Sequence, residues 1–253
     1  MTNNDIALTE FDPSQKAVLE PDHEKIDVRF PDIAVFAFVG SAVDEYAASR
    51  GMTKISEFVS IVKKYPVYLG RSGDNDFVLC EAPVGAPAAV QIMDWLIGYG
   101  VKTVIAAGSC GALADIPENT FLIPVRALRD EGTSFHYMPP SRYAETDEYL
   151  RSVIRSVFEA RSLKYMECTT WTTDGFFRET EAKVRSRLDE GCVCVEMECS
   201  ALAACASFRK AKFAQILFTA DSLADVKEYD ERNWGVDSLS PSLELCVDVV
   251  ARL

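Results

Sequence analysis

The sequence predicts a single α/β domain, in which a central, mostly parallel mixed β-sheet is flanked by helices. Short apolar runs such as Ile33–Val39 and Val104–Ala107 are typical of strands that are buried on both faces. Segments with apolar residues at helical spacing alternate with these runs, as in folds with a parallel sheet. A chain of 253 residues is long enough for one such domain with a substantial core.

The predicted elements follow one another from the first apolar run to the C-terminus. Strands are expected at Ile33–Val39, Phe77–Glu81, Val104–Ala107, Phe121–Val125, Cys192–Glu196 and Ala214–Ala220. Helices are expected at Ala86–Tyr99, Glu145–Arg161, Thr180–Asp189, Glu198–Phe208 and Ser240–Leu253. Residues 1–25 are polar, acidic and without periodicity. We therefore expect an N-terminal arm over residues 1–25 and one domain over residues 26–253.

The charge and the cysteines restrict the classes of partner. A formal net charge of −13 disfavours a nucleic-acid backbone or an anionic membrane surface, because proteins that bind these normally present a basic face. The first residues lack the pattern of a secretory signal, and no apolar run is long enough to span a bilayer. We expect a cytoplasmic protein whose eight cysteines are reduced and buried. No metal site is expected, because no CxxC pair or nearby histidine accompanies the cysteines.

Three predicted strands end in polar or glycine-rich residues, and ligands bind beyond the carboxyl ends of strands in such a sheet. The strands end in Gly40-Ser41, in Gly108-Ser109-Cys110-Gly111 and in Thr219-Ala220-Asp221-Ser222. We expect Gly108–Gly111 to form a turn whose N–H groups and Ser109 hydroxyl are available to an oxyanion or a sugar hydroxyl. A tight turn without a ligand explains the segment equally well. The segment matches neither the GxGxxG pattern nor the P-loop.

Two carboxylates flank a methionine where a predicted strand meets an alanine-rich helix, at Glu196-Met197-Glu198. Carboxylates are rarely buried without a partner. A carboxylate accepts two hydrogen bonds in one plane, which suits the vicinal hydroxyls of a ribose. From composition alone, acidic residues favoured by the dipole of a helix N-terminus are the stronger interpretation.

Asp221 stands at the end of an apolar run and has two interpretations. A partly desolvated aspartate has a raised pKa and holds a proton near neutrality, so it can protonate a leaving base. The alternative is a helix N-cap, a position that aspartate fills well.

Six segments of the chain occur together in a fixed order. They are Gly40, Gly108-Ser109-Cys110-Gly111-Ala112-Leu113, Arg129–Tyr137, Thr172–Phe177, Val195–Glu198 and Asp221. In this order, on predicted strand ends, they resemble the nucleoside phosphorylase and uridine phosphorylase superfamily, which also contains the methylthioadenosine nucleosidases. The resemblance runs from about His23 to the C-terminus.

The resemblance implies how a nucleoside would be held. Glu198 matches the carboxylate that grips the ribose 2′- and 3′-hydroxyls, Met197 packs under the sugar, and Glu196 belongs to the same ribose-binding group. His23 corresponds to a histidine that reaches the ribose 5′ end of a neighbouring subunit.

For the base, the resemblance makes Phe176 the stacking aromatic and Asp221 the acid that protonates a purine. Thr180 and Ala182 stand where uracil-specific members carry glutamine and arginine, which favours a purine. A glycosidic bond breaks through an oxocarbenium-like sugar, so Glu198 near the ribose and protonated Asp221 near the base would divide the stabilisation of the transition state.

The phosphate side departs from the pattern of the phosphorylases. The resemblance assigns Gly40, Ser109 and Lys63, or the adjacent Lys64, to phosphate or another anion. Asp44 and Ala106, however, stand where phosphorylases have arginine. Two basic residues elsewhere, Arg129 and Arg178, are candidates for a relocated anion site.

The nucleosidase branch lacks those arginines and activates water with a glutamate soon after the first strand. Glu45 stands at the matching distance from Gly40. An exposed charge on the following helix is the alternative interpretation of Glu45.

Three functions follow as hypotheses. The first is a phosphorylase that converts a purine nucleoside and phosphate to free base and ribose 1-phosphate. The second is a nucleosidase that uses water with Glu45 as general base, and the third is a catalytically weak nucleoside-binding protein. No cofactor is expected, inorganic phosphate being the co-substrate. The resemblance also implies a homodimer, alone or within a hexamer, with sites shared across the interface.

Overall fold

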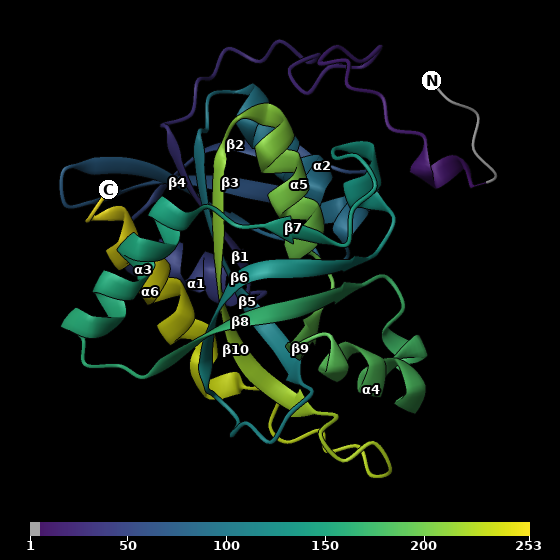
Figure 1. Ribbon diagram of the computed structural model, residues 1–253. Coiled ribbons are helices and arrows are strands. Elements are labelled where there is room, and N and C mark those ends of the chain that lie inside the picture. Colours follow the sequence, from purple (N-terminus) through teal and green to yellow (C-terminus); the bar gives the residue numbers. More distant parts are fainter. Residues whose placement is uncertain (1–5) are drawn as a thin grey trace.

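A computed structural model describes residues 6–253 and confirms the α/β fold class, with a mixed sheet covered by helices (Figure 1). The strands are β1 (Ile33–Phe38), β2 (Thr53–Val59), β3 (Lys64–Ser72), β4 (Asn75–Glu81), β5 (Thr103–Ala112), β6 (Phe121–Asp130), β7 (Tyr143–Glu145), β8 (Tyr165–Thr173), β9 (Cys192–Glu196) and β10 (Lys212–Ser222). The helices are α1 (Ala42–Ser49), α2 (Ala86–Gly98), α3 (Glu148–Ala160), α4 (Glu181–Asp189), α5 (Cys199–Arg209) and α6 (Leu239–Val250), with four short 3₁₀ turns, η1 (Ala7–Thr9), η2 (Thr133–His136), η3 (Phe176–Arg178) and η4 (Val236–Ser238).

The sheet follows the order β10-β6-β8-β9-β5-β1-β4-β3-β2, and β10 also pairs with β5. Strands β5, β10, β6, β8 and β9 therefore close on themselves, while β4, β3 and β2 extend the sheet beyond β1. The central pairs β1–β4, β1–β5 and β5–β10 are parallel. The carboxyl ends of β1, β5 and β10 consequently meet at one edge.

Alternate residues of β1 enter two different cores, because helices cover both faces of the sheet. Ala34 and Phe36 pack on the side of α2 and α5. Ile33, Val35 and Ala37 pack on the side of α1, α3 and α6. This double burial explains the continuous apolar run that predicted the strand.

The segment Gly108–Gly111 corrects one expectation, because it continues β5 as extended chain and does not form a turn. Ser109 and Cys110 lie opposite Phe218 and Thr219 of β10. Gly111 lies opposite Val195 of β9. Pairing on both sides holds the backbone extended, although glycine alone favours a turn.

The described part of the N-terminal arm lies along the face of α2 and α5, where Figure 1 shows it as the purple trace. The Phe11 ring packs edge-on against the Phe208 ring, with 6.5 Å between the ring centroids. The Arg209 guanidinium lies 3.4 Å from the Gln15 carbonyl, to which it donates a hydrogen bond. The expected division at residue 25 stays a prediction.

Two further features concern the cysteines and the helices. All eight cysteines are buried and none forms a disulfide. Within residues 6–253, no helix has the length and apolar character needed to cross a bilayer.

Candidate active site

A cavity of ≈ 190 Å³ opens beyond the carboxyl ends of β1, β5, β9 and β10. It brings together most of the residues that the sequence singled out, which come from segments far apart in the chain. They are Gly108, Ser109, Gly111, Phe176, Glu196, Met197, Glu198 and Asp221. The remaining lining residues include Phe38, Val84, Glu179, Gln215 and Trp234.

Glu196 ends β9 and is saturated with hydrogen bonds from the protein. One carboxylate oxygen accepts from the Thr172 hydroxyl at 2.6 Å and the Thr170 hydroxyl at 3.3 Å. The other accepts from the backbone N–H groups of Glu198 at 2.8 Å and Cys199 at 2.6 Å. Burial raises the pKa of Glu196 to about 7, while the Thr172 hydroxyl and these two N–H groups oppose that rise. Glu196 therefore caps the first turn of α5, with its negative charge at the positive end of the helix.

Glu198 stands at the N-cap position of α5 and is also buried. Its Oε1 atom accepts from the Gly85 N–H at 2.5 Å. Gly85 has a φ of +101°, which an L side chain rarely adopts, so glycine suits this position. Burial, and then the charge of Glu196, raises the pKa of Glu198 to about 8. The backbone N–H of Met197 is a second hydrogen-bond donor to this carboxyl group, and both Met197 and Glu198 line the cavity.

Asp221 lies near the end of β10, where the strand leaves the core. The side chain is 6% exposed, and its Oδ2 atom accepts from the Tyr229 hydroxyl at 3.1 Å. Burial raises the pKa of Asp221, although the Tyr229 hydrogen bond lowers it in part. The described geometry thus favours a carboxyl group that retains its proton to higher pH than an exposed aspartate does.

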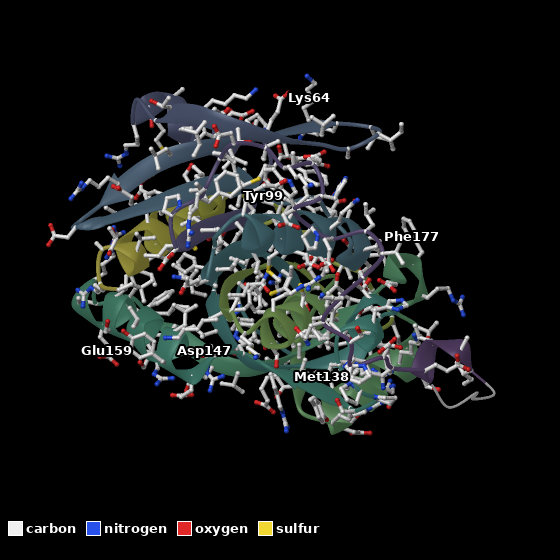
Figure 2. All side chains as sticks on the ribbon, turned by 90° about the horizontal axis from the view of Figure 1, so that it is seen from above. Lys64, Tyr99, Met138, Asp147, Glu159 and Phe177 are labelled. Carbon is white, nitrogen blue, oxygen red and sulfur yellow. The ribbon has the colours of Figure 1, made fainter. Side chains whose placement is uncertain are left out.

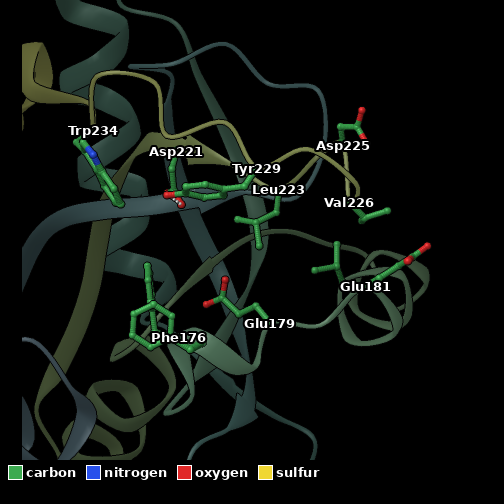
Figure 3. A pocket seen from close by; sticks show the side chains of 11 residues that line it. Phe176, Glu179, Glu181, Asp221, Leu223, Asp225, Val226, Tyr229 and Trp234 are labelled. Atoms are coloured by element: carbon green, nitrogen blue, oxygen red, sulfur yellow. Dashed lines mark hydrogen bonds between the residues drawn. The ribbon is translucent and has the colours of Figure 1, made fainter.

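The aromatic side of the cavity is formed by Phe176 of η3 and by Trp234; Figure 3 shows Trp234 beside Asp221 and Phe176 beside Glu179. Sequence reasoning missed both Glu179 and Trp234. Neither belongs to a periodic segment or a strand end, so no local pattern marked them. Burial, and then the charge of Asp221, raises the pKa of Glu179 to about 7.

A second cavity of ≈ 550 Å³ adjoins the first. The two share Phe176, Glu179, Asp221 and Trp234 as lining residues. The space beyond these four is bounded by Phe177, Glu181, Val184, Leu223, Asp225, Val226 and Tyr229 (Figure 3).

Several predicted residues lie outside the first cavity. Glu45 is exposed on α1, and its Oε1 atom accepts from the Ser41 hydroxyl at 3.1 Å. His23 lines a separate cavity beside the N-terminal arm and α2. Gly40, with a φ of +57°, turns the chain from β1 into α1 and is not a lining residue.

The basic candidates are likewise placed elsewhere. Lys63 lies between β2 and β3, where its ammonium donates to both oxygens of Glu81 at 2.7 and 2.6 Å. Figure 2 shows the neighbouring Lys64 pointing away from the molecule. Arg129 is buried and donates to the Ser134 and Ser141 hydroxyls and to nearby carbonyl groups, which is a structural role. No lysine, arginine or histidine is among the described residues that line the first cavity.

Comparison with known proteins identifies the family of the chain. The family model of the phosphorylase superfamily matches residues 32–247. The chain is 26% identical to a guanosine phosphorylase of Halorubrum lacusprofundi over 167 residues, which cover 66% of this chain and 69% of that one. It is 24% identical to a uridine phosphorylase of Haemophilus influenzae, but that match covers only 48% of either chain.

A solved structure shows the same fold. The 5'-methylthioadenosine/S-adenosyl homocysteine nucleosidase of Campylobacter jejuni superposes with a TM-score of 0.73 at 18% identity, covering 88% of this chain and 100% of that chain. The resemblance seen in the six motifs is confirmed, and the chain belongs to the phosphorylase superfamily.

Proposed function

We propose that this protein is a nucleoside phosphorylase that cleaves purine nucleosides with inorganic phosphate to free base and ribose 1-phosphate. One observation carries the proposal. A single cavity is lined by Glu198 and Met197, from the junction of β9 and α5, and by Phe176 and Asp221, from η3 and the end of β10. The first pair suits a ribose and the second pair suits a purine, so the glycosidic bond would lie between them.

The chemistry divides between the two carboxyl groups. As the bond between C1′ and the purine N9 breaks, its electron pair moves into the base, and positive charge develops on the sugar. Asp221, whose pKa is raised by burial, is placed to act as the general acid that donates a proton to N7 of the departing purine. Glu198 accepts hydrogen bonds from the ribose hydroxyls and stabilises the positive sugar when it is ionised. Phosphate then adds to C1′.

The site offers few groups to phosphate within one chain. The exposed Ser109 side chain on β5 lines the cavity together with Gly108, and we assign these two residues to phosphate. Lys63 would have to leave Glu81, or act on the site of a neighbouring subunit, to contribute. The phosphorylase names among the sequence relatives support phosphate as the nucleophile. We propose that the active form is a homo-oligomer in which residues such as His23 and Lys63 complete a neighbour's site.

A nucleosidase is the second candidate, and the lack of lysine, arginine and histidine among the described lining residues favours it. Water needs no cationic clamp, whereas a phosphate dianion does. The general base expected for hydrolysis, Glu45, is exposed and lies outside the cavity, which counts against this candidate.

Base release with and without phosphate distinguishes the candidates. The purified protein would be incubated with inosine, guanosine and adenosine, and free base and ribose 1-phosphate would be measured. We expect base release only with phosphate, together with an equal amount of ribose 1-phosphate. Release that does not depend on phosphate would instead establish the nucleosidase, and binding without release would leave a nucleoside-binding protein.

A further inference from the structure

The cavity that adjoins the nucleoside site has no role in the cleavage of a simple nucleoside. Its ≈ 550 Å³ exceeds the ≈ 190 Å³ of the cavity that holds Glu198 and Asp221. The two are joined through Phe176, Glu179, Asp221 and Trp234, which all belong to the base side. The larger space is therefore a continuation of the base pocket, on the side away from the ribose-binding residues.

The lining of this continuation is mainly apolar. Val184 of α4 packs with Leu223 and Val226 in one hydrophobic cluster. Figure 3 shows Leu223 and Val226 lying between the Asp221 strand end and α4, with the Tyr229 ring beside Asp221. Such a surface favours an uncharged hydrocarbon or aromatic group.

The charges around the continuation exclude an anionic group. Its titratable lining residues other than Tyr229 are all acids, namely Glu179, Glu181, Asp221 and Asp225. The Glu181 carboxylate forms a salt bridge with Arg185 at 2.7 Å, and Asp225 accepts from the Lys227 backbone N–H at 3.0 Å. Both are therefore engaged locally. No lysine, arginine or histidine is among the described lining residues.

Glu179 stands at the junction of the two cavities and is available to a ligand. Its carboxyl group has no hydrogen bond or salt bridge with any residue from 6 to 253, whereas Asp130 holds the nearby Lys183 at 3.0 Å. Burial and the charge of Asp221 raise the pKa of Glu179 to about 7. A desolvated carboxyl group without a protein partner is an acceptor for an N–H donor of the substrate.

The chemistry of a purine connects these observations. N7 and the substituent at C6 lie on the same edge of the ring system. A base whose N7 faces Asp221 therefore directs its C6 substituent toward the neighbouring Glu179. An exocyclic amine at C6 would donate to Glu179, and a group attached to that amine would enter the continuation.

We propose that the protein accepts purine nucleosides in which the exocyclic amine at C6 carries an apolar substituent. Glu179 receives the N–H of that amine, and the Val184, Leu223 and Val226 surface holds the substituent. This inference rests on the proposed function and names its substrate class. It assigns Glu179 and the apolar continuation to specificity for the base.

The test compares adenosine with N6-benzyladenosine as substrates of the same full-length protein, with phosphate present. We expect kcat/KM for N6-benzyladenosine to equal or exceed that for adenosine. Val226→Trp would fill the continuation and lower kcat/KM for the benzyl substrate at least about tenfold, because an overfilled pocket excludes the group. Cleavage of adenosine would stay within about twofold by the same reasoning. Val62→Trp, at an exposed position between β2 and β3, is the matched control and should change neither substrate.

A second variant tests Glu179 separately. Glu179→Met removes the acceptor but keeps the size of the side chain. We expect the ratio of kcat/KM for adenosine to that for inosine to fall about ten- to a hundredfold, because inosine has no amine at C6 and a hydrogen bond to a carboxylate is lost only with adenosine. A ratio that does not change would overturn the role of Glu179.

The two proposals fail in different ways. If the protein cleaves adenosine but cleaves N6-benzyladenosine a hundredfold more poorly, the continuation does not hold the C6 substituent, and the proposed function stands. If Val226→Trp lowers cleavage of both substrates equally, the assignment of the continuation to the C6 substituent is also overturned. If neither nucleoside is cleaved and inosine and guanosine are also inert, the proposed function is overturned and the inference falls with it.

Discussion

The two ends of the proposed nucleoside cavity, the proposed ribose end and the proposed base end, differ in how completely the protein satisfies its own polar groups. On the ribose side, both oxygens of Glu196 and one oxygen of Glu198 accept hydrogen bonds from backbone or threonine groups. On the base side, Asp221 accepts from the Tyr229 hydroxyl and from its own backbone N–H, and Glu179 accepts from no described residue. The ribose end is thus preorganised, and the base end leaves acceptors for the ligand.

The difference has a structural origin. The ribose end is built at one junction, where β9 passes directly into α5, and the neighbouring β8 supplies the threonines. The base end is assembled from η3 and the residues just after it, from the last residues of β10, and from the segment that follows β10. A sugar is common to all nucleosides whereas the base varies, so a rigid ribose site and an open base site fit a family of related substrates.

The largest expected effect is at the base end. Asp221→Asn keeps the shape of the side chain but removes the proton donor, so kcat/KM for inosine should fall about 10²- to 10⁴-fold. Asp237→Asn, at an exposed aspartate of η4, is the matched control and should retain full activity. Circular dichroism would confirm that both variants are folded. Unchanged turnover of Asp221→Asn would show that Asp221 is structural.

A smaller effect is expected at the ribose end. Above about pH 8, where Glu198 is ionised, Glu198→Gln retains an acceptor for the Gly85 N–H but lacks the negative charge that would accept from the ribose hydroxyls and stabilise the positive sugar. The kcat/KM for a ribonucleoside should fall about 10- to 100-fold, the range for a lost hydrogen bond to a charged group. The wild-type protein should prefer ribo- over 2′-deoxyribonucleosides, and this preference should weaken in the variant. Equal use of both sugars by the wild type would contradict the role of Glu198.

The sequence predicted the ribose end better than the base end, and the reason is local. Glu196, Met197 and Glu198 adjoin an apolar strand and an alanine-rich helix, so their position could be read from neighbouring residues. Asp221 was marked in the same way by the strand that precedes it. Glu179 was not, because its proximity to Asp221 depends on how distant segments fold together.

Pairing between distant strands also decided where the sequence was wrong or silent. Gly108–Gly111 suggested a turn, but its partners in β9 and β10 keep it extended. β8 was not predicted, because threonines replace a continuous apolar run in Tyr165–Thr173. β2 was also missed, because it is at the edge of the sheet and largely exposed or half-buried.

The smallest expected effect concerns stability and pH. The pKa of Glu198 is raised to about 8 by burial and by Glu196, so the folded protein holds a proton that the unfolded chain has released above about pH 4.5. Its contribution to stability is complete below pH 4.5 and is lost as pH rises toward 8. Glu198→Gln cannot lose a proton, so it should melt at a higher temperature than the wild type at pH 8. We expect a gain of at least about 2–4 °C, which corresponds to ~1 kcal/mol in a domain of this size.

That difference should disappear well below pH 4.5, where Glu198 is protonated in both the folded and the unfolded protein. Differential scanning calorimetry across this pH range would measure it. A variant that is less stable than the wild type at pH 8 would show that the Glu198 carboxylate is ionised and stabilising in the folded protein.

The most direct test of the central claim is a crystal structure of the protein with phosphate and a purine C-nucleoside, whose carbon–carbon bond to the sugar cannot be cleaved. We expect the 2′- and 3′-hydroxyls of the ligand to lie within hydrogen-bond distance of Glu198. We also expect the base to lie against Phe176 with its N7 edge facing Asp221. A ligand bound elsewhere, or bound with its base at Glu198 and its sugar at Asp221, would contradict the division of the cavity into a ribose end and a base end.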